Sequence, residues 1–232
     1  MNWQAIILTA KLSSMVSLIL LLVGLPLAAW VAFSRWRWKF LVHAVVGLPL
    51  VLPPTVLGFY VLVAIGGQSP VGRWYTHLTG HSFAFSFQGL LLASVLYSLP
   101  FAVQPFAAAF SSIDPKLIAA SSVLGASRAR TFVRVVLPLS FTGILTGIVL
   151  SFAHTVGEFG VVLMVGGNIP GVTQTLSIYI YDQVQAFNFA DANRTSFVLL
   201  IFSFLALCVV YAANPQLRSG WLSQPKFKRA EP

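Results

Sequence analysis

Charged residues, and acidic ones above all, are scarce in this sequence. Only 8% of its 232 residues are charged, and only five residues are Asp or Glu. Soluble domains usually carry about 25% charged residues, because their surface must be hydrated. This chain is 57% hydrophobic with a mean hydropathy of +0.86, so it cannot supply such a surface. The composition excludes an ordinary soluble enzyme and predicts an integral membrane protein whose outer face meets lipid.

Cysteine and the common catalytic motifs are also missing or nearly so. The single cysteine, Cys208, excludes an internal disulfide and a cysteine-based zinc cluster. The sequence has no Gly-x-x-x-x-Gly-Lys phosphate loop, which excludes ATP binding of that kind. His77 and His81 are four residues apart, but Gly80 separates them and a third ligand is lacking, so we expect solvated loop histidines. We therefore predict no catalytic residue, no metal site and no cofactor.

Long uncharged stretches separate the few charges. About 20 apolar residues are needed to cross the hydrocarbon core, and a helix satisfies its own backbone hydrogen bonds there. Residues 159–181 are also uncharged, but Gly and Pro interrupt them, so we expect a broken or short hydrophobic segment that lines a cavity. A sixth, short helix is the alternative there. The sequence thus predicts an all-α fold with five transmembrane helices, at about 9–34, 40–66, 86–111, 131–156 and 196–214.

Prolines mark the second of these predicted spans. Pro53 and Pro54 fall in its middle, where the missing backbone donors should kink or break the helix. Neighbouring helices in a membrane protein can satisfy the carbonyls that such a break frees. The break either shapes the packing or forms a hinge whose opened backbone lines a pathway, and the residues alone leave both interpretations open.

Lys and Arg give the orientation, because cytoplasmic loops retain them. The basic residues gather in the 34–39 loop, in the 112–134 loop and in the tail after residue 214, leaving only Lys11, Arg73 and Arg194 elsewhere. We expect these three segments to be cytoplasmic and the N-terminus to lie outside. The net charge of +9 is explained by this retention and by anionic lipid, and without a nucleic-acid-binding motif we expect no nucleic-acid partner.

The loop at 112–134 has more structure than a simple connection requires. Asp114 and Pro115 are typical of a helix N-cap and first position. Leu117, Ala120, Ser121 and Leu124 then follow helical spacing, and Gly125 can end the helix. Small side chains dominate this segment, so another protein can approach it closely; these are Ala119, Ala120, Ser121, Ser122, Ala126 and Ser127.

The run AASSVLGASRARTFVRVVLP resembles the cytoplasmic loop motif of binding-protein-dependent ABC importer permeases. In that family, Glu-Ala-Ala and three residues precede a Gly, and a basic and aromatic stretch then ends in Leu-Pro. Gly125, Phe132, Leu137 and Pro138 match, whereas the acidic residue is absent. The resemblance implies the importer-permease (MetI-like) fold: one transmembrane domain over 1–232, with a coupling loop at 112–130 and a cytoplasmic tail at 215–232. It also implies that a separate ABC ATPase subunit docks on Asp114, Ala120, Ser121, Leu124, Gly125, Ala126 and Arg128.

A second set of motifs resembles the molybdate branch of that family. It comprises Gly157-Glu158-Phe159-Gly160, Asn168-Ile169-Pro170-Gly171 followed by Thr173 and Thr175, and the run from Leu48 to Gly58. Sulfate permeases share the first motif but resemble the second less. The resemblance implies an importer of molybdate, with tungstate or sulfate as the alternative. It implies four partners: the ABC ATPase, a periplasmic or extracellular molybdate-binding protein, a second copy of the chain and membrane lipid.

Candidate pathway or gate residues follow from these motifs. They are Pro53, Pro54, Thr55, Gly157, Glu158, Phe159, Gly160 and Asn168. A tetrahedral dianion needs hydrogen-bond donors, and a carboxylate facing it would repel it, so we expect Glu158 to be a structural acceptor that caps or joins helices, with gating as the alternative. For His154 we expect a polar packing contact. An ion-coupled secondary transporter would need inverted repeats and buried coupling carboxylates, which the sequence does not indicate.

Overall fold

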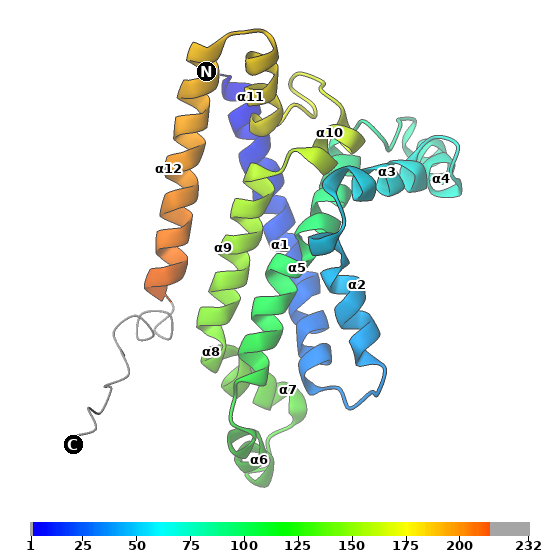
Figure 1. Cartoon of the computed structure of the whole chain (residues 1–232). Coiled ribbons are helices and arrows are strands. Elements are labelled where there is room, and N and C mark those ends of the chain that lie inside the picture. Colours follow the sequence, from blue (N-terminus) through cyan, green and yellow to red (C-terminus); the bar gives the residue numbers. More distant parts are fainter. Residues whose placement is uncertain (1, 214–232) are drawn as a thin grey trace, which may run out of the picture.

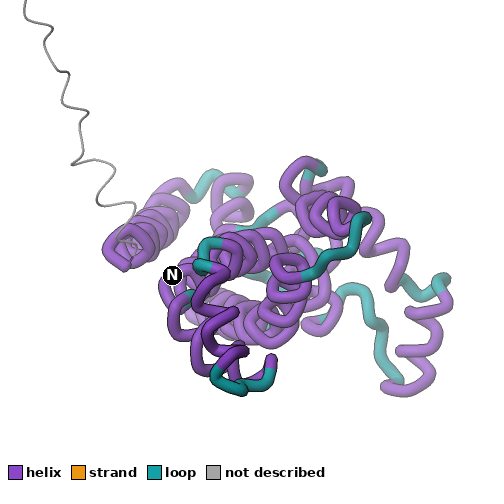
Figure 2. The backbone as a smooth tube through the Cα atoms, turned by 90° about the horizontal axis from the view of Figure 1, so that it is seen from below, coloured by secondary structure: helices purple, strands orange, loops and turns teal. Residues whose placement is uncertain are grey.

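The computed structural model describes residues 2–213, and every regular element in that range is a helix (Figures 1 and 2). The predicted tail at 215–232 lies outside the described residues. The helices are α1 (Trp3–Phe33), α2 (Lys39–Val51), α3 (Pro54–Ile65), α4 (Pro70–Thr79), α5 (Phe87–Ser111), α6 (Pro115–Val123), α7 (Arg128–Thr131), the π-helix η1 (Phe132–Val136), α8 (Leu137–Leu139), α9 (Phe141–Gly157), α10 (Gly160–Gly166), α11 (Leu176–Gln185) and α12 (Phe189–Ala213).

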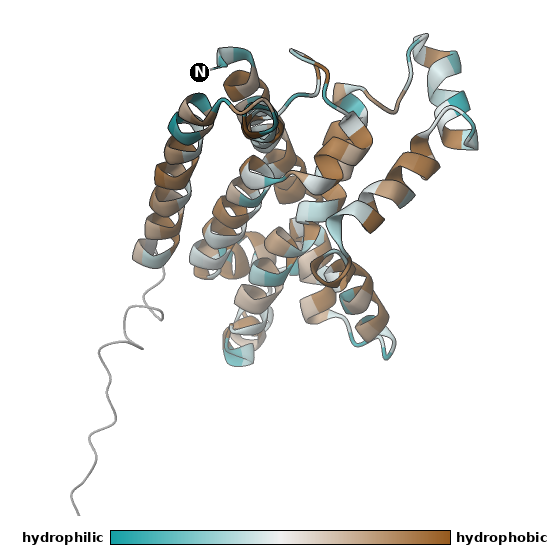
Figure 3. Cartoon of the chain, turned by 45° about the horizontal axis from the view of Figure 1, so that its top comes forward, coloured by the Kyte–Doolittle hydropathy of each residue, from teal (hydrophilic) through white to brown (hydrophobic). Residues whose placement is uncertain are grey.

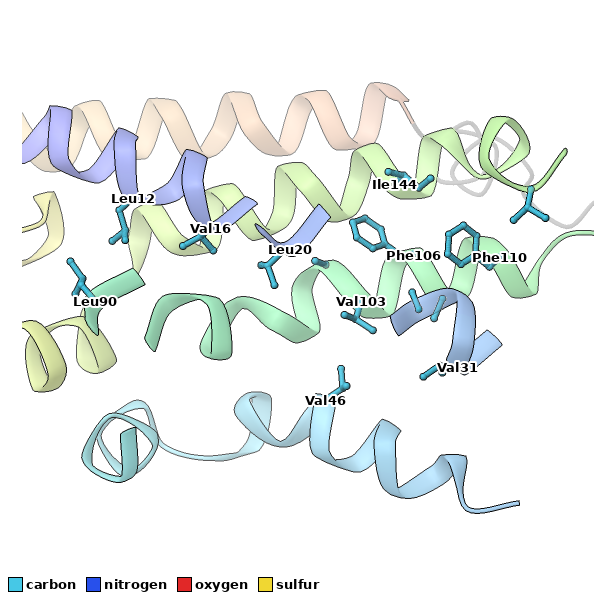
Figure 4. Close-up of a cluster of buried hydrophobic side chains, with 14 of the residues drawn as sticks. Leu12, Val16, Leu20, Val31, Val46, Leu90, Val103, Phe106, Phe110 and Ile144 are labelled. Carbon is cyan, nitrogen blue, oxygen red and sulfur yellow. The ribbon is translucent and has the colours of Figure 1, made fainter. Parts of the chain in front are cut away.

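The core lies where α5 packs against α1 and α9. Buried side chains from these three helices fill it along its length, as the close-up in Figure 4 shows. Two glycines let α9 approach closely: a Cβ on Gly147 would lie 2.5 Å from the Phe106 ring, and one on Gly143 would collide with Ala109. Small residues at such contacts are typical of membrane helices, where close van der Waals packing drives association.

The lipid-facing surface is apolar along the bundle and polar at its ends (Figure 3). The helix α12 packs on α9 and α11 and exposes Phe197, Leu200 and Phe204. Within the described residues, α1, α5 and α12 are long and apolar enough to cross a membrane, and the number rises to five if each of two bent helix pairs is one span. The prediction of an all-α membrane fold is confirmed, and five spans agree with the second way of counting.

The predicted break in the second span is confirmed. The axes of α2 and α3 differ in direction by 113°, and the chain turns at Leu52 and Pro53, which are both extended. Pro54 then begins α3 as its first residue, where a missing N–H costs no hydrogen bond. A second bend of 71° separates residues 128–139 from α9 at Ser140. It follows the π-helix η1, a local widening of the helix that often marks functional positions.

Two helix ends differ from the predicted spans. The first helix begins at Trp3 rather than near residue 9, since the Asn2 side chain caps it by accepting from the Ala5 N–H at 3.2 Å. The last begins at Phe189 rather than near 196, because Asp191 and Arg194 lie one turn apart on it, with 3.9 Å between their charged atoms. Charge spacing identified most of each helix but missed the first turns, which precede Lys11 in α1 and contain Asp191 and Arg194 in α12.

The interrupted segment at 159–181 is broken, as predicted. It contains the short helix α10 and the first part of the short helix α11, and neither is long enough to be a candidate span. Gly167 and Gly171 have φ angles of +65° and +76°, a backbone that side chains with a Cβ rarely adopt, and they reverse the chain between the two helices.

Candidate functional site

The α6–α7 hairpin (residues 115–131) projects from one end of the bundle (Figure 1). The predicted helix start is confirmed: the Asp114 side chain accepts from the Lys116 N–H at 2.8 Å, and Pro115 is the first residue of α6. Gly125 turns the chain after the helix with a φ of +79°. At the tip, Val123 is 87% exposed and Leu124 is 86% exposed, so the hairpin presents apolar side chains beyond the bundle.

A hydrogen bond closes this hairpin, and apolar contacts join it to the bundle. Ser121 on α6 and Thr131 on α7 share a hydrogen bond of 2.8 Å between their hydroxyls. Phe132 then packs edge-on against Phe110 of α5, with 5.7 Å between ring centroids, and the buried Ile113 leads from α5 into α6. These contacts connect the hairpin to α5 and to the bent helix at 128–139.

The structure brings the predicted loop residues together in this hairpin or beside it. Ala120, Leu124, Gly125 and Arg128 are exposed, as is the N-cap Asp114. Ala126 and Ser121 are only partly exposed, and the Ser121 hydroxyl faces Thr131 inside the hairpin. That side chain holds the hairpin closed and presents little surface to a partner.

The two helix breaks predicted from sequence lie against each other. A Cβ on Gly160 would lie 2.8 Å from the Pro54 Cβ, and one on Gly58 would lie 2.8 Å from the Met164 Cβ, so α10 and α3 pack almost backbone to backbone. Figure 1 shows these two helices side by side. Thr55, in the first turn of α3, is exposed beside this contact. The Pro53-Pro54 and Gly157–Gly160 motifs thus form one site, although about a hundred residues separate them.

Glu158 is a buried carboxylate at the end of α9. Its side chain, just after α9, is only 4% exposed, but neither carboxylate oxygen has a hydrogen-bond partner among residues 2–213. The Ser94 hydroxyl on α5 is the neighbouring donor, and by strict geometry it too has no hydrogen-bond partner within the described residues. Glu158 is therefore buried beside Ser94 of α5, and its role as an acceptor that joins α9 to α5 stays a prediction. Such a group is expensive to keep, which is typical of positions held for function.

His154 makes the polar packing contact that was expected. Its Nδ1 atom lies 3.0 Å from the Ser98 hydroxyl, which also bonds the Thr155 hydroxyl at 2.9 Å. The ring stacks on Phe101 with 3.8 Å between centroids and is tilted against Tyr97 at 4.9 Å. These contacts join α9 to α5 one turn before Glu158.

Asn168 does not lie with the other pathway candidates. Its side-chain amide donates to both carboxylate oxygens of Asp182, at 2.9 and 2.7 Å, while its carbonyl accepts from the Gln174 amide at 2.9 Å. Gln174 in turn accepts from Asn2 at 3.2 Å. This network ties the 167–175 loop to α11 and to the start of α1. Sequence reasoning missed Asp182, although the scarcity of acidic residues made each one a signal.

The fold and these motifs define a class of protein. Residues 24–213 match the family described as binding-protein-dependent transport system inner membrane component, so the chain belongs to that family. The fold agrees with solved importers of low identity: the MetNI methionine ABC transporter (TM-score 0.69, 18% identity, 90% of this chain and 94% of that one) and a bacterial ABC transporter involved in alginate import (0.65, 19%, 94% and 80%). The importer-permease fold inferred from the loop motif is confirmed.

Particular relatives are much closer in sequence. The molybdenum transport system permease protein ModB of Azotobacter vinelandii is 48% identical over 210 residues, which cover 90% of this chain and 93% of that protein. The protein of the same name from Escherichia coli K12 is 34% identical over 230 residues, covering 99% and 96%. A probable sulfate transport permease of Chlorella vulgaris is 30% identical over 211 residues, covering 90% and 78%.

Proposed function

We propose that this chain is the permease subunit of an ATP-driven importer that moves molybdate across the cytoplasmic membrane. The observation that carries the proposal is the 48% identity to the Azotobacter molybdenum permease over nearly the full length of both proteins. The probable sulfate permease is more distant and matches a smaller share of its own length, which favours molybdate over sulfate. ATP hydrolysis belongs to a separate subunit, and the chain itself is no enzyme.

The α6–α7 hairpin is the docking point for that ATPase subunit. Three observations support this role: the exposed apolar tip at Val123 and Leu124, the small side chains along α6, and the rigid fastening at Ser121–Thr131. The hairpin thus offers a surface for a partner and a mechanical connection to the helices behind it. The charged contact of the family motif is absent here, so apolar packing at the tip supplies most of the docking energy.

The contact between α3 and α10 is the part of the pathway that moves. Pro53 and Thr55 are exposed beside it, on the surface of one chain and not inside an enclosed channel. This exposure supports a pathway formed between two copies of the chain. Movement of one broken helix past the other then opens or closes that pathway, while a binding protein outside the membrane delivers the oxyanion.

The orientation follows the distribution of charge. The basic residues of the α1–α2 loop and of the α6–α7 region lie at the same end of the bundle, opposite the N-terminus (Figure 1). Positive charge is retained on the cytoplasmic side, so this end is cytoplasmic and the N-terminus is outside. The tail after α12 then begins on the cytoplasmic side as well.

The proposal is tested by reconstituting the chain with its ATPase subunit and binding protein in liposomes. We expect ATP-dependent accumulation of molybdate that the Leu124→Asp variant loses, because a charge at the tip opposes apolar docking. Sulfate in hundredfold excess should compete weakly, whereas tungstate should compete well. Uptake without ATP, or a preference for sulfate, would overturn the proposal.

A further inference from the structure

A cavity of about 990 Å³ lies between the end of α1 and the α6–α7 hairpin. Four apolar side chains form much of its wall: Phe33, Ile118, Phe132 and Val136. Two arginines line it as well, Arg35 from the α1–α2 loop and Arg128 from the first turn of α7. A single cavity thus combines a cationic and an apolar lining.

Neither arginine has a carboxylate partner in the part of the chain that the structure describes. The ion pair found there joins Arg194 and Asp191 at another place, and the nearby Asp114 already caps α6. Two guanidinium groups at one cavity create a site for an anion, and Arg suits phosphate because its planar fork can donate two parallel hydrogen bonds. A small anion alone would leave the apolar wall unfilled.

Aromatic residues place this cavity at the membrane surface. Trp30 and Trp36 pack together at the end of α1, with 5.8 Å between ring centroids, and Arg37 lies over the Trp38 ring at 5.6 Å. Exposed tryptophans beside basic residues at the end of an apolar helix are typical of the headgroup region. Basic pockets between membrane helices at that depth suit anionic lipid headgroups.

We infer that this cavity binds an anionic phospholipid, with its phosphate at Arg35 and Arg128 and the start of its acyl chains against Phe33 and Phe132. The volume is at the upper end of what small-molecule sites use, about 300–1,000 Å³, and far exceeds what a free phosphate needs. The lipid bridges α1 and the α6–α7 hairpin, so it stiffens the segment that we propose receives the ATPase. The inference rests on this end of the bundle lying at the membrane surface and is independent of the transported substrate.

The test uses the full chain in complex with its ATPase subunit, in phosphatidylcholine nanodiscs that contain phosphatidylglycerol. Native mass spectrometry counts the phosphatidylglycerol that stays bound. The double variant Arg35→Gln/Arg128→Gln removes the two cavity charges, and Arg37→Gln/Arg130→Gln removes the same charge from the same two segments outside the cavity. We expect the first variant to retain about one phosphatidylglycerol fewer per chain than the native protein, and the second to retain as many.

Four results would overturn the inference. These are an equal loss of lipid in both variants, no loss in either, full displacement of phosphatidylglycerol by millimolar inorganic phosphate, and loss of the ATPase subunit without loss of lipid. Displacement by inorganic phosphate would mean that the cavity binds free phosphate. Loss of the ATPase subunit without loss of lipid would mean that the two arginines contact an acidic surface of that subunit.

A second measurement on the native protein covers the case in which the cavity variant does not fold. The fluorescence of Trp36 is the difference between the native protein and the Trp36→Phe variant. Brominated phosphatidylglycerol should quench this fluorescence several-fold more strongly than brominated phosphatidylcholine at the same mole fraction. Equal quenching by the two lipids would contradict a specific site.

Discussion

Gly160 lies directly against Pro54, so that a methyl group at Gly160 would sit 2.8 Å from the Pro54 Cβ. This contact joins the first residue of α10 to the first residue of α3, and each helix begins just after a break in the chain. Both helices are short and begin at a break, so their relative position can differ from that of the long helices to which they are joined. We regard this contact as the movable element that an ATPase acting through α6 displaces.

The first prediction concerns the closeness of that contact. Gly160→Ala should lower the free energy of unfolding by about 1–3 kcal/mol, the usual cost of an overpacked contact. Gly157→Ala is the matched control, because nothing lies within 4 Å of a Cβ there. Thermal melting of the two purified variants gives the comparison, and equal melting temperatures would show that α10 and α3 do not pack as described.

The second prediction concerns the buried carboxylate. Glu158→Gln should leave the melting temperature unchanged or raise it, because it replaces a buried ionisable group, without a hydrogen bond by strict geometry, by a neutral amide of similar shape. Thr155→Val, one turn away, should cost about 1–2 kcal/mol because the Thr155 hydroxyl bonds both Ser98 and the Ser151 carbonyl.

Transport by the Glu158→Gln variant separates the two roles considered for Glu158. Loss of uptake by a stable, correctly assembled variant would indicate gating. A clear drop in the melting temperature would instead mean that the carboxylate makes a stabilising contact, contrary to the structure.

A third prediction addresses the hydrogen-bond network between the 167–175 loop and α11. Asn168→Ala removes two hydrogen bonds to Asp182 and one from Gln174, which is buried. We expect a loss of about 1–3 kcal/mol and faster proteolysis within the 167–175 loop. Asn188→Ala, which removes a single exposed bond to Gln183, should stay within about 0.5 kcal/mol of the native chain. Equal stability of the two variants would mean that the Asn168 network does not stabilise the protein.

The fourth prediction separates two roles of the α6–α7 hairpin: binding the ATPase subunit, and passing the movement of that subunit on to the helices. Thr131→Val breaks the hydroxyl pair that closes the α6–α7 hairpin, whereas Thr131→Ser keeps it. The valine variant should still bind the ATPase subunit, because the tip is intact, but should move severalfold less molybdate per ATP hydrolysed. Uptake and phosphate release measured on the same liposomes give this ratio, and an unchanged ratio would exclude the hairpin as a rigid connection.

Local signals in the sequence predicted much of the fold. The cap at Asp114, the turn at Gly125 and the break at Pro53-Pro54 are each determined by residues within a few positions of one another, and all three are present. Apolar length likewise indicated the long helices. Charge spacing predicts too late a start for α12, because a helix can continue past the membrane surface through charged residues.

Contacts between distant segments could not be predicted in this way. Nothing near Asn168 indicates that its partner is Asp182, and nothing near Gly160 indicates Pro54, because both pairs depend on how the helices pack. The bend at Ser140 depends on the widened turn of η1 before it, for which Pro138 alone is a weak signal. Motif resemblance grouped Asn168 with the break, whereas the structure separates them.

The most direct test of the account is the accessibility of the hairpin tip. With Cys208→Ala removing the native thiol, a single Leu124→Cys is probed with a membrane-impermeant maleimide. We predict labelling in inverted membrane vesicles, no labelling in intact cells, and protection when the ATPase subunit is bound. Labelling from outside intact cells, or labelling that the bound ATPase does not reduce, would contradict the proposal that the hairpin tip is a cytoplasmic docking point for the ATPase subunit.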